Sequence, residues 1–299
     1  MRVVLVFLDG VGIGSADPAR NPFLSASLPT VRGALGGVPT LDSPRLEGPG
    51  GRSLPLDAGL GVEGRPQSGT GQTALLTGEN AAERFGRHFG PWTPTGLRPL
   101  LAERNVLVRA RDAGRRVAFA NAYPERYLER VPSRRMAAPP LAAHAAGVLD
   151  RHQDHLARGE AVASEIVNDG WRKHLGFSTL PEVSPEAAGA NLAGIVRAHD
   201  LTLYAHYRTD EAGHAGTREA AHAALERVDR FLGGLLQALP DDGLVVVASD
   251  HGNLEELDAG HTTNPVLGLL LGRRPPADDH LDSILDVTEH LLRWSGVDA

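Results

Sequence analysis

The sequence predicts an α/β protein with a mostly parallel sheet flanked by helices and a small helical insertion or cap. Apolar, β-branched runs alternate along the chain with segments of helical spacing, the pattern of a sheet covered by helices on both faces. These runs are continuous and do not alternate in polarity, as expected for buried parallel strands. With 299 residues, 41% of them hydrophobic and 22% charged, the chain has the composition of a folded globular protein.

The elements follow one another in a simple order. Strands are predicted at residues 3–8, 117–120, 201–206, 244–248 and 266–271. Helical spacing recurs at residues 73–76, 105–113, 187–198, 218–239 and 284–294. Residues 38–71 are rich in Gly and Pro, so we expect a long loop there, with a short strand at 54–56. Long loops in compact domains often carry function.

The middle of the chain differs in composition from the rest. Residues 123–185 consist mainly of Ala, Arg, His and Glu at helical spacing, without a strong strand. We therefore predict an α/β core formed by residues 1–122 and 186–299, with residues 123–185 as the helical insertion or cap.

Charge and residue usage exclude several classes of protein. A net charge of −7 argues against nucleic-acid binding, which requires a basic surface. The chain has no cysteine, so any metal must be held by His, Asp, Glu, Ser or Thr. The apolar run 3–8 is too short for a signal peptide and no stretch approaches the length of a membrane span, so we expect a cytoplasmic protein without a membrane partner.

Acidic and histidine residues follow three of the predicted strands, and ligands of α/β sheets gather at the carboxyl ends of strands. Asp9 ends the first strand, although an Asp-Gly pair alone is most often a turn. Asp210 and His214 follow the strand 201–206 at a spacing that puts both on one face of a helix, suited to chelating a cation. A capped helix start with an exposed histidine explains that pair equally well.

The third strand end carries Asp250 and His251. Adjacent residues on a strand point to opposite faces, so both can reach one metal only where the chain turns, as Gly252 allows. His261 precedes the strand 266–271, where it is either a further ligand or a loop histidine.

A candidate nucleophile lies in the segment 66–78. Small residues precede a helix start there, so the hydroxyl of Ser68 or Thr70 would lie at a helix N-terminus, where amide groups and the helix dipole favour an anion. This is a suitable place for an alkoxide that faces a phosphate. An ordinary N-cap is the structural alternative.

Together and in this order, these segments resemble the alkaline phosphatase superfamily of metalloenzymes, especially the cofactor-independent phosphoglycerate mutases and the phosphopentomutases. The resemblance covers about residues 1–120 and 190–299. The motifs that carry it are Asp9-Gly10, Asp210-x-x-Gly213-His214, Asp250-His251-Gly252-Asn253 and His261-Thr262-Thr263-Asn264-Pro265.

The resemblance implies two divalent metal ions and a serine nucleophile. One ion would be held by Asp210, His214 and His261, and the other by Asp9, Asp250 and His251. The mutase nucleophile is followed after three and after ten residues by glycine. Ser68, Gly71 and Gly78 keep this spacing, so Ser68 is preferred to Thr70. The chain departs from those mutases at Gln72, where they have a histidine.

These residues predict a two-metal phosphoryl-transfer enzyme, either a phosphohydrolase or a phosphomutase, that acts on a small phosphorylated metabolite through a phosphoserine intermediate. Mixed His and Asp ligation suits Mn²⁺ or Zn²⁺, and Mg²⁺ is also compatible. Arg65, Asn121 and Arg208 are the predicted substrate contacts, because they lie near strand ends or the nucleophile loop and Arg suits phosphate binding.

Two other functions fit the same motifs. A phosphodiesterase or nucleotide pyrophosphatase would use the same two-metal site, and a non-catalytic metal-binding protein could keep the fold. Retention of the expected ligands argues against a non-catalytic protein. The short middle segment favours net hydrolysis over phosphoglycerate mutation, since a mutase must hold its dephosphorylated intermediate in a closed chamber that excludes water.

Overall fold

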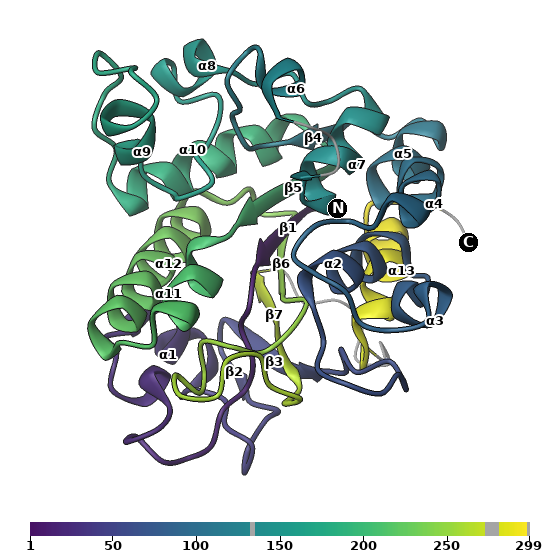
Figure 1. The fold of residues 1–299 in the computed structure, drawn as a ribbon. Coiled ribbons are helices and arrows are strands. Elements are labelled where there is room, and N and C mark those ends of the chain that lie inside the picture. Colours follow the sequence, from purple (N-terminus) through teal and green to yellow (C-terminus); the bar gives the residue numbers. More distant parts are fainter. Residues whose placement is uncertain (132–134, 273–280, 298–299) are drawn as a thin grey trace.

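The computed structural model describes residues 1–131, 135–272 and 281–297, and a seven-stranded sheet runs through its centre (Figure 1). The strand order is β2-β3-β7-β6-β1-β5-β4. The strands are β1 (Arg2–Leu8), β2 (Glu47–Gly48), β3 (Gly51–Leu56), β4 (Val117–Phe119), β5 (Leu201–His206), β6 (Gly243–Ala248) and β7 (Val266–Gly272). The predicted fold class is confirmed, with helices on both faces of this sheet.

The direction of one predicted strand was wrong. β1 pairs in parallel with β5 and β6, and β4 pairs in parallel with β5, as the sequence predicts. β7 is buried like the parallel strands, but it runs antiparallel to β6 and to β3. A strand covered on both faces has the same apolar composition in either direction, so the sequence could not distinguish the two.

Alternate side chains of β1 divide the core into two layers. Val3, Leu5 and Phe7 pack with the helices α2 (Ser68–Thr77), α4 (Arg98–Arg104), α5 (Val106–Asp112), α7 (Ala138–Ala146) and α13 (Ile284–Trp294). Val4, Val6 and Leu8 face α1 (Pro29–Leu35), α10 (Pro185–Ala198) and α12 (Arg218–Ala238). Period-two alternation along a central strand therefore places one helical layer on each side of the sheet.

The helices that cover the second face begin at side-chain caps. Ser184 caps α10 and Pro185 follows as its first residue, while Thr217 accepts a bond from the third amide of α12. Such caps satisfy amide groups that have no partner within the helix. α10 packs along α12, and α12 continues from α11 (Arg208–Ala215). Outside the predicted insertion, the other short elements are η1 (Pro22–Leu24), α3 (Ala81–Phe85) and η2 (Thr95–Leu97).

In its described residues, the predicted insertion 123–185 contains four α-helices of at most nine residues. α6 (Tyr127–Arg130), α8 (Gln153–Ala157) and α9 (Asp169–Lys173) lie near the β4 edge of the sheet, at the top of Figure 1. α8 and α9 contribute Leu156 and Trp171 to a small apolar cluster that also contains Leu180. α7 instead packs into the main core against α4 and α5. The domain boundaries remain a prediction, and residues 132–134, 273–280 and 298–299 of those ranges lie outside the described residues.

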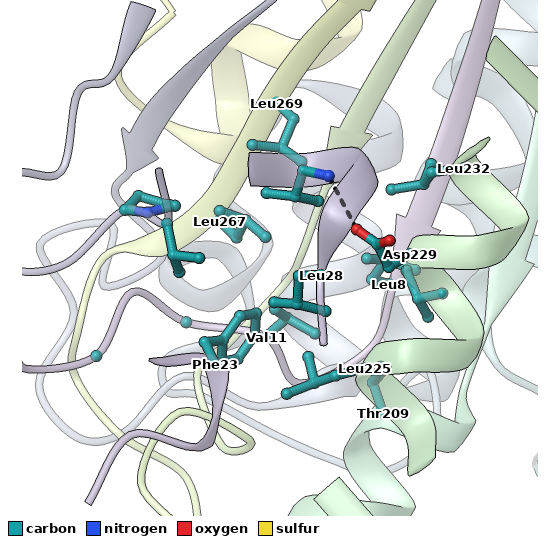
Figure 2. A pocket seen from close by; sticks show the side chains of 16 residues that line it. Leu8, Val11, Phe23, Leu28, Thr209, Leu225, Asp229, Leu232, Leu267 and Leu269 are labelled. Carbon is teal, nitrogen blue, oxygen red and sulfur yellow. Dashed lines mark hydrogen bonds between the residues drawn. The ribbon is translucent and has the colours of Figure 1, made fainter. Parts of the chain in front are cut away.

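An apolar cavity of about 30 Å³ lies between α1, α12 and the strands (Figure 2). Its lining side chains are apolar apart from Thr209 and Asp229. The Asp229 carboxylate accepts bonds from the backbone amides of Thr30 and Val31. Asp229 thus caps α1 from a neighbouring helix. Because the carboxylate is already satisfied, this cavity is a packing feature of the fold.

Within the described ranges, no helix is long and apolar enough to cross a membrane.

Candidate active site

Three neighbouring strands bring the predicted ligands together. β1 lies between β5 and β6, so the segments that follow these strands meet at one edge of the sheet. Asp9 follows β1 directly, and Asp250 and His251 follow β6, where the regular strand has ended at Ala248. Asp210 lies in the first turn of α11, which follows β5.

The helix α11 presents Asp210 and His214 to the same side, as the four-residue spacing predicts. His214 Nε2 lies 3.3 Å from Asp210 Oδ2. The Thr209 hydroxyl donates to the carbonyl of Asp9 at 2.6 Å, which fixes the start of α11 against the end of β1. Gly10 has a left-handed φ of 68°, and a Cβ there would lie 2.5 Å from Asp210 Oδ1. The glycine after Asp9 is therefore required for the two strand ends to approach.

His251 lies at the centre of the cluster and is fully buried. Its Nε2 is 3.2 Å from Asp9 Oδ1 and 3.8 Å from Asp250 Oδ2. The ring of His261 stacks on the His251 ring, with 3.9 Å between centroids. His261 Nε2 lies 3.7 Å from Asp210 Oδ1, so the stack joins the two halves of the cluster.

Ser68 is the first residue of α2, and its Oγ lies 3.0 Å from His251 Nε2. The Thr70 hydroxyl points away, because it bonds to the carbonyls of Gln67 and Phe89. A Cβ at Gly71 would lie 2.7 Å from the carbonyl of Asp250, so glycine lets α2 approach the end of β6. Of the two candidate hydroxyls, the structure brings Ser68 to the cluster.

The crowded charges change the protonation of the cluster. Burial raises the pKa of Asp9 well above its usual value, and the nearby Asp250 raises it further. Burial alone would lower the pKa of His251, but the surrounding carboxylates Asp250, Asp9 and Asp210 raise it to about 10. Burial and the His251 charge lower the pKa of His261 to about 4. The excess of buried carboxylates favours positive charge at this place.

The residues present fit divalent metal ions. Asp9, Asp250 and His251 form one group with ligand atoms within 4.8 Å of one another, and Asp210, His251 and His261 form another. Asp250 Oδ2 is buried and has no hydrogen-bond partner among the described residues. A buried carboxylate oxygen without a partner is costly unless a cation meets it. His214 completes the predicted set, since its Nε2 lies 3.3 Å from His261 Nε2.

The sequence analysis missed Glu255, a fully buried carboxylate behind the cluster. It accepts bonds from the amides of Gly12 and Asn253, from the Thr262 hydroxyl and from the Asn264 side chain. A Cβ at Gly12 would lie 2.3 Å from Glu255 Oε1. Glu255 thus holds three ligand-bearing loops together. The sequence signal was an acid two residues after Asn253, within a motif already assigned to metal binding.

Gln72, the departure from the mutase motif, also lies in the cluster. Its Nε2 donates to Asp9 Oδ2 at 3.2 Å, and its Oε1 accepts from the Ala138 amide. The amide therefore orients one predicted ligand and ties α7 to the site.

The predicted substrate contacts are dispersed. Arg65 is exposed and donates to the carbonyl of Ala259 at 2.9 Å. Asn121 is buried and bonds to the backbone N–H and carbonyl of Ala205, so it clamps β4 to β5. Arg208 starts α11 and pairs with Glu165 and Glu211. Arg208 lines a pocket whose lining does not include the predicted metal ligands.

This fold and cluster define an alkaline-phosphatase-like α/β protein. The fold is similar to that of a cold-active alkaline phosphatase from Shewanella sp., with a TM-score of 0.55 and 12% identity over all of both chains. It is also similar to that of the PH0037 protein from Pyrococcus horikoshii, with a TM-score of 0.59 and 13% identity over 100% of this chain and 97% of that one.

Residues 176–298 match the Metalloenzyme superfamily, which confirms the predicted resemblance to the alkaline phosphatase superfamily. A 2,3-bisphosphoglycerate-independent phosphoglycerate mutase of Wolinella succinogenes is 44% identical over 83 residues, 27% of this chain and 17% of the relative. The corresponding enzyme of Cereibacter sphaeroides is 33% identical over 127 residues, 39% of this chain and 25% of the relative. The matched stretches thus span a quarter or less of the length of these relatives.

Proposed function

We propose that the chain is a two-metal phosphoryl-transfer enzyme that acts on a small phosphorylated metabolite through a phosphoserine at Ser68. The observation that carries this proposal is the position of the Ser68 hydroxyl, at the start of α2 and 3.0 Å from His251 Nε2 in a cluster of acids and histidines. A serine that served only as an N-cap would not need to be buried among carboxylates, as Ser68 is.

Each residue of the cluster has a role in this proposal. Asp9, Asp250 and His251, whose ligand atoms lie close together, would hold one divalent ion. Asp210, His214 and His261 would hold the other, since His214 Nε2 lies 3.3 Å from both Asp210 Oδ2 and His261 Nε2. Mn²⁺ or Zn²⁺ are the expected metals. Bound divalent ions would supply positive charge for the phosphoryl group and lower the pKa of the serine hydroxyl. Gln72 orients Asp9, and Glu255 holds the loops that carry the ligands.

The chemistry takes place in two displacements. Ser68 Oγ loses its proton to solvent as the Oγ–P bond forms and the P–O bond to the leaving alcohol breaks. The alcohol oxygen keeps the electron pair and takes a proton from water. Attack by water on the phosphoserine then releases phosphate and restores the hydroxyl. The amide groups at the start of α2 favour the anionic oxygen during both displacements.

Substitution of the nucleophile tests the proposal. Ser68→Ala should reduce turnover of phosphomonoesters by at least about a thousandfold, and it should abolish ³²P labelling of the chain by a labelled ester. Thr70→Ser is the matched control, since it keeps a hydroxyl that bonds to the loop at Phe89. Full activity and labelling of Ser68→Ala would overturn the assignment, and loss of both in Thr70→Ala alone would move it to Thr70.

The outcome of the reaction is a separate part of the proposal. We favour hydrolysis over mutation, since the segment 123–185 is short and its helices α6, α8 and α9 are of one or two turns. Phosphate release set against isomer formation, measured for 3-phosphoglycerate and ribose 1-phosphate, decides between them. Interconversion of either pair without free phosphate would contradict hydrolysis. Faster cleavage of bis(4-nitrophenyl) phosphate than of 4-nitrophenyl phosphate would favour the phosphodiesterase alternative.

A further inference from the structure

A second pocket, of about 520 Å³, opens between α6, α9 and the start of α11. Most of its surface is apolar, and its lining includes three tyrosines and one tryptophan. These are Tyr123, Tyr127, Trp171 and Tyr207. Its volume lies within the range of roughly 300–1,000 Å³ typical of sites that enclose drug-sized ligands. A three-carbon acid would fill only a small part of such a pocket.

The pocket adjoins the candidate active site. Tyr207 lines it, and the Tyr207 ring packs edge-on against Phe7 of β1, with 6.3 Å between centroids. Arg208 and Glu211 also line it, and both belong to the helix that carries Asp210. The start of α11 is therefore a wall shared by the cluster and the pocket.

The charged groups that line the pocket are paired with one another or exposed. Arg208 pairs with Glu165 and Glu211, so its charge is neutralised by the protein. The Ser164 hydroxyl accepts a bond from Asn121. The other arginine among the described lining residues, Arg130, is exposed. Among the described lining residues, a carboxylate or a second phosphate would find no buried, unpaired cation, whereas an aromatic ring would find several ring faces and edges.

We infer that this pocket binds the alcohol part of the phosphate ester, and that this alcohol is aromatic. The inference rests on the proposed function, and it specifies the class of substrate. Tyr127 and Trp171 would enclose the ring while its ester oxygen points toward Ser68. Selectivity then comes from the segment 123–185, because three of the four aromatic residues belong to it.

The test combines binding and turnover. Titration calorimetry of 1-naphthol into Mn²⁺-loaded Ser68→Ala chain measures the pocket without catalysis, and 1-naphthyl phosphate and 3-phosphoglycerate measure turnover in the parent chain. We expect 1-naphthol to bind, and kcat/KM to be at least about tenfold higher for the naphthyl ester. Tyr127 and Leu175 both line the pocket. Tyr127→Ala and Leu175→Ala should each weaken naphthol binding roughly three- to tenfold and raise KM for that ester, with little change in kcat.

The matched control is Leu128→Ala. Leu128 is exposed on the same helix as Tyr127 and does not line the pocket, so this variant should bind naphthol like the parent. Absence of naphthol binding, or equal effects of Tyr127→Ala and Leu128→Ala, would overturn the inference even if 3-phosphoglycerate is hydrolysed. Tyr127-dependent binding without hydrolysis of either ester would support the pocket and refute the proposed function.

Discussion

The cluster of acids and histidines and the aromatic pocket share a wall at α11, yet they are built differently. The cluster draws most of its side chains from the segments after β1, β5 and β6, and its loops are held by the buried Glu255. The pocket is formed largely by α6 and α9, helices of four and five residues, and one of its lining residues, Leu175, is 51% exposed. This difference indicates a division of roles. The sheet holds the residues proposed for catalysis in place, whereas the sequence of the segment with short helices can vary and change substrate selectivity.

The largest effect should follow from removing a ligand of the cluster. Asp250→Asn should lower turnover by about a thousandfold or more, because a charge that holds the metal is lost. The same change should not destabilise the metal-free chain, since it relieves repulsion between Asp250 and Asp9. Phosphate-release assays with metal analysis and calorimetry measure the two effects. Asp258→Asn, in an exposed position on the loop before His261, is the control. Parental activity of Asp250→Asn would show that the cluster is not catalytic.

Metal removal should separate the two regions. Adding Mn²⁺ or Zn²⁺ to chelator-treated protein at about a hundred times Kd should stabilise it by about 2.7 kcal/mol per site, because the ion binds only the folded cluster. Thermal unfolding should then shift upward by several degrees. Binding of 1-naphthol to the pocket should be nearly unchanged by the metal. An unchanged unfolding temperature with either ion would contradict the two-metal site.

The support of the cluster can be tested at Glu255. Glu255→Gln replaces one acceptor oxygen by an NH₂ group, which would face groups that are themselves donors. We therefore expect the free energy of unfolding to fall by about 3 kcal/mol. Urea unfolding measures this change. Glu256→Gln is the matched control, because Glu256 forms an exposed ion pair with Arg20 and should contribute less than about 1 kcal/mol. Equal midpoints for the two variants would show that the Glu255 bonds do not hold the loops.

The smallest effect concerns the ion pair of Asp200 with Arg116, which joins the starts of β4 and β5. Bonding to Arg116 lowers the pKa of Asp200 to about 2. Since the folded pKa lies below the unfolded one, the pair stabilises the chain above about pH 4 and the contribution is lost as pH falls toward 2. Asp200→Asn should therefore cost less than about 1 kcal/mol at pH 7, and the cost should vanish as pH falls through about 2. If the difference in free energy of unfolding between the parent and Asp200→Asn grew at low pH, this prediction would be wrong.

The sequence predicted the parts of the molecule that depend on local pattern. The strand 201–206 is found at the predicted residues, and Ser68 begins a helix as expected. Other features depend on contacts between distant segments. Glu255 accepts a bond from the amide of Gly12, which lies 243 residues earlier in the sequence, and no periodicity indicates such a bond. The aromatic pocket joins Tyr123, Trp171 and Tyr207, which only the folded chain brings together.

The edge strands of the sheet have a consequence for encounters between molecules. β2 contains two residues and β4 three, so both margins of the sheet are short. A long, flat margin would expose a row of unpaired N–H and carbonyl groups, on which a strand of another molecule could add. Here neither margin offers more than a few such groups. We therefore expect the protein to resist polymerisation by strand addition when it is concentrated, and copies that associate would do so through side chains.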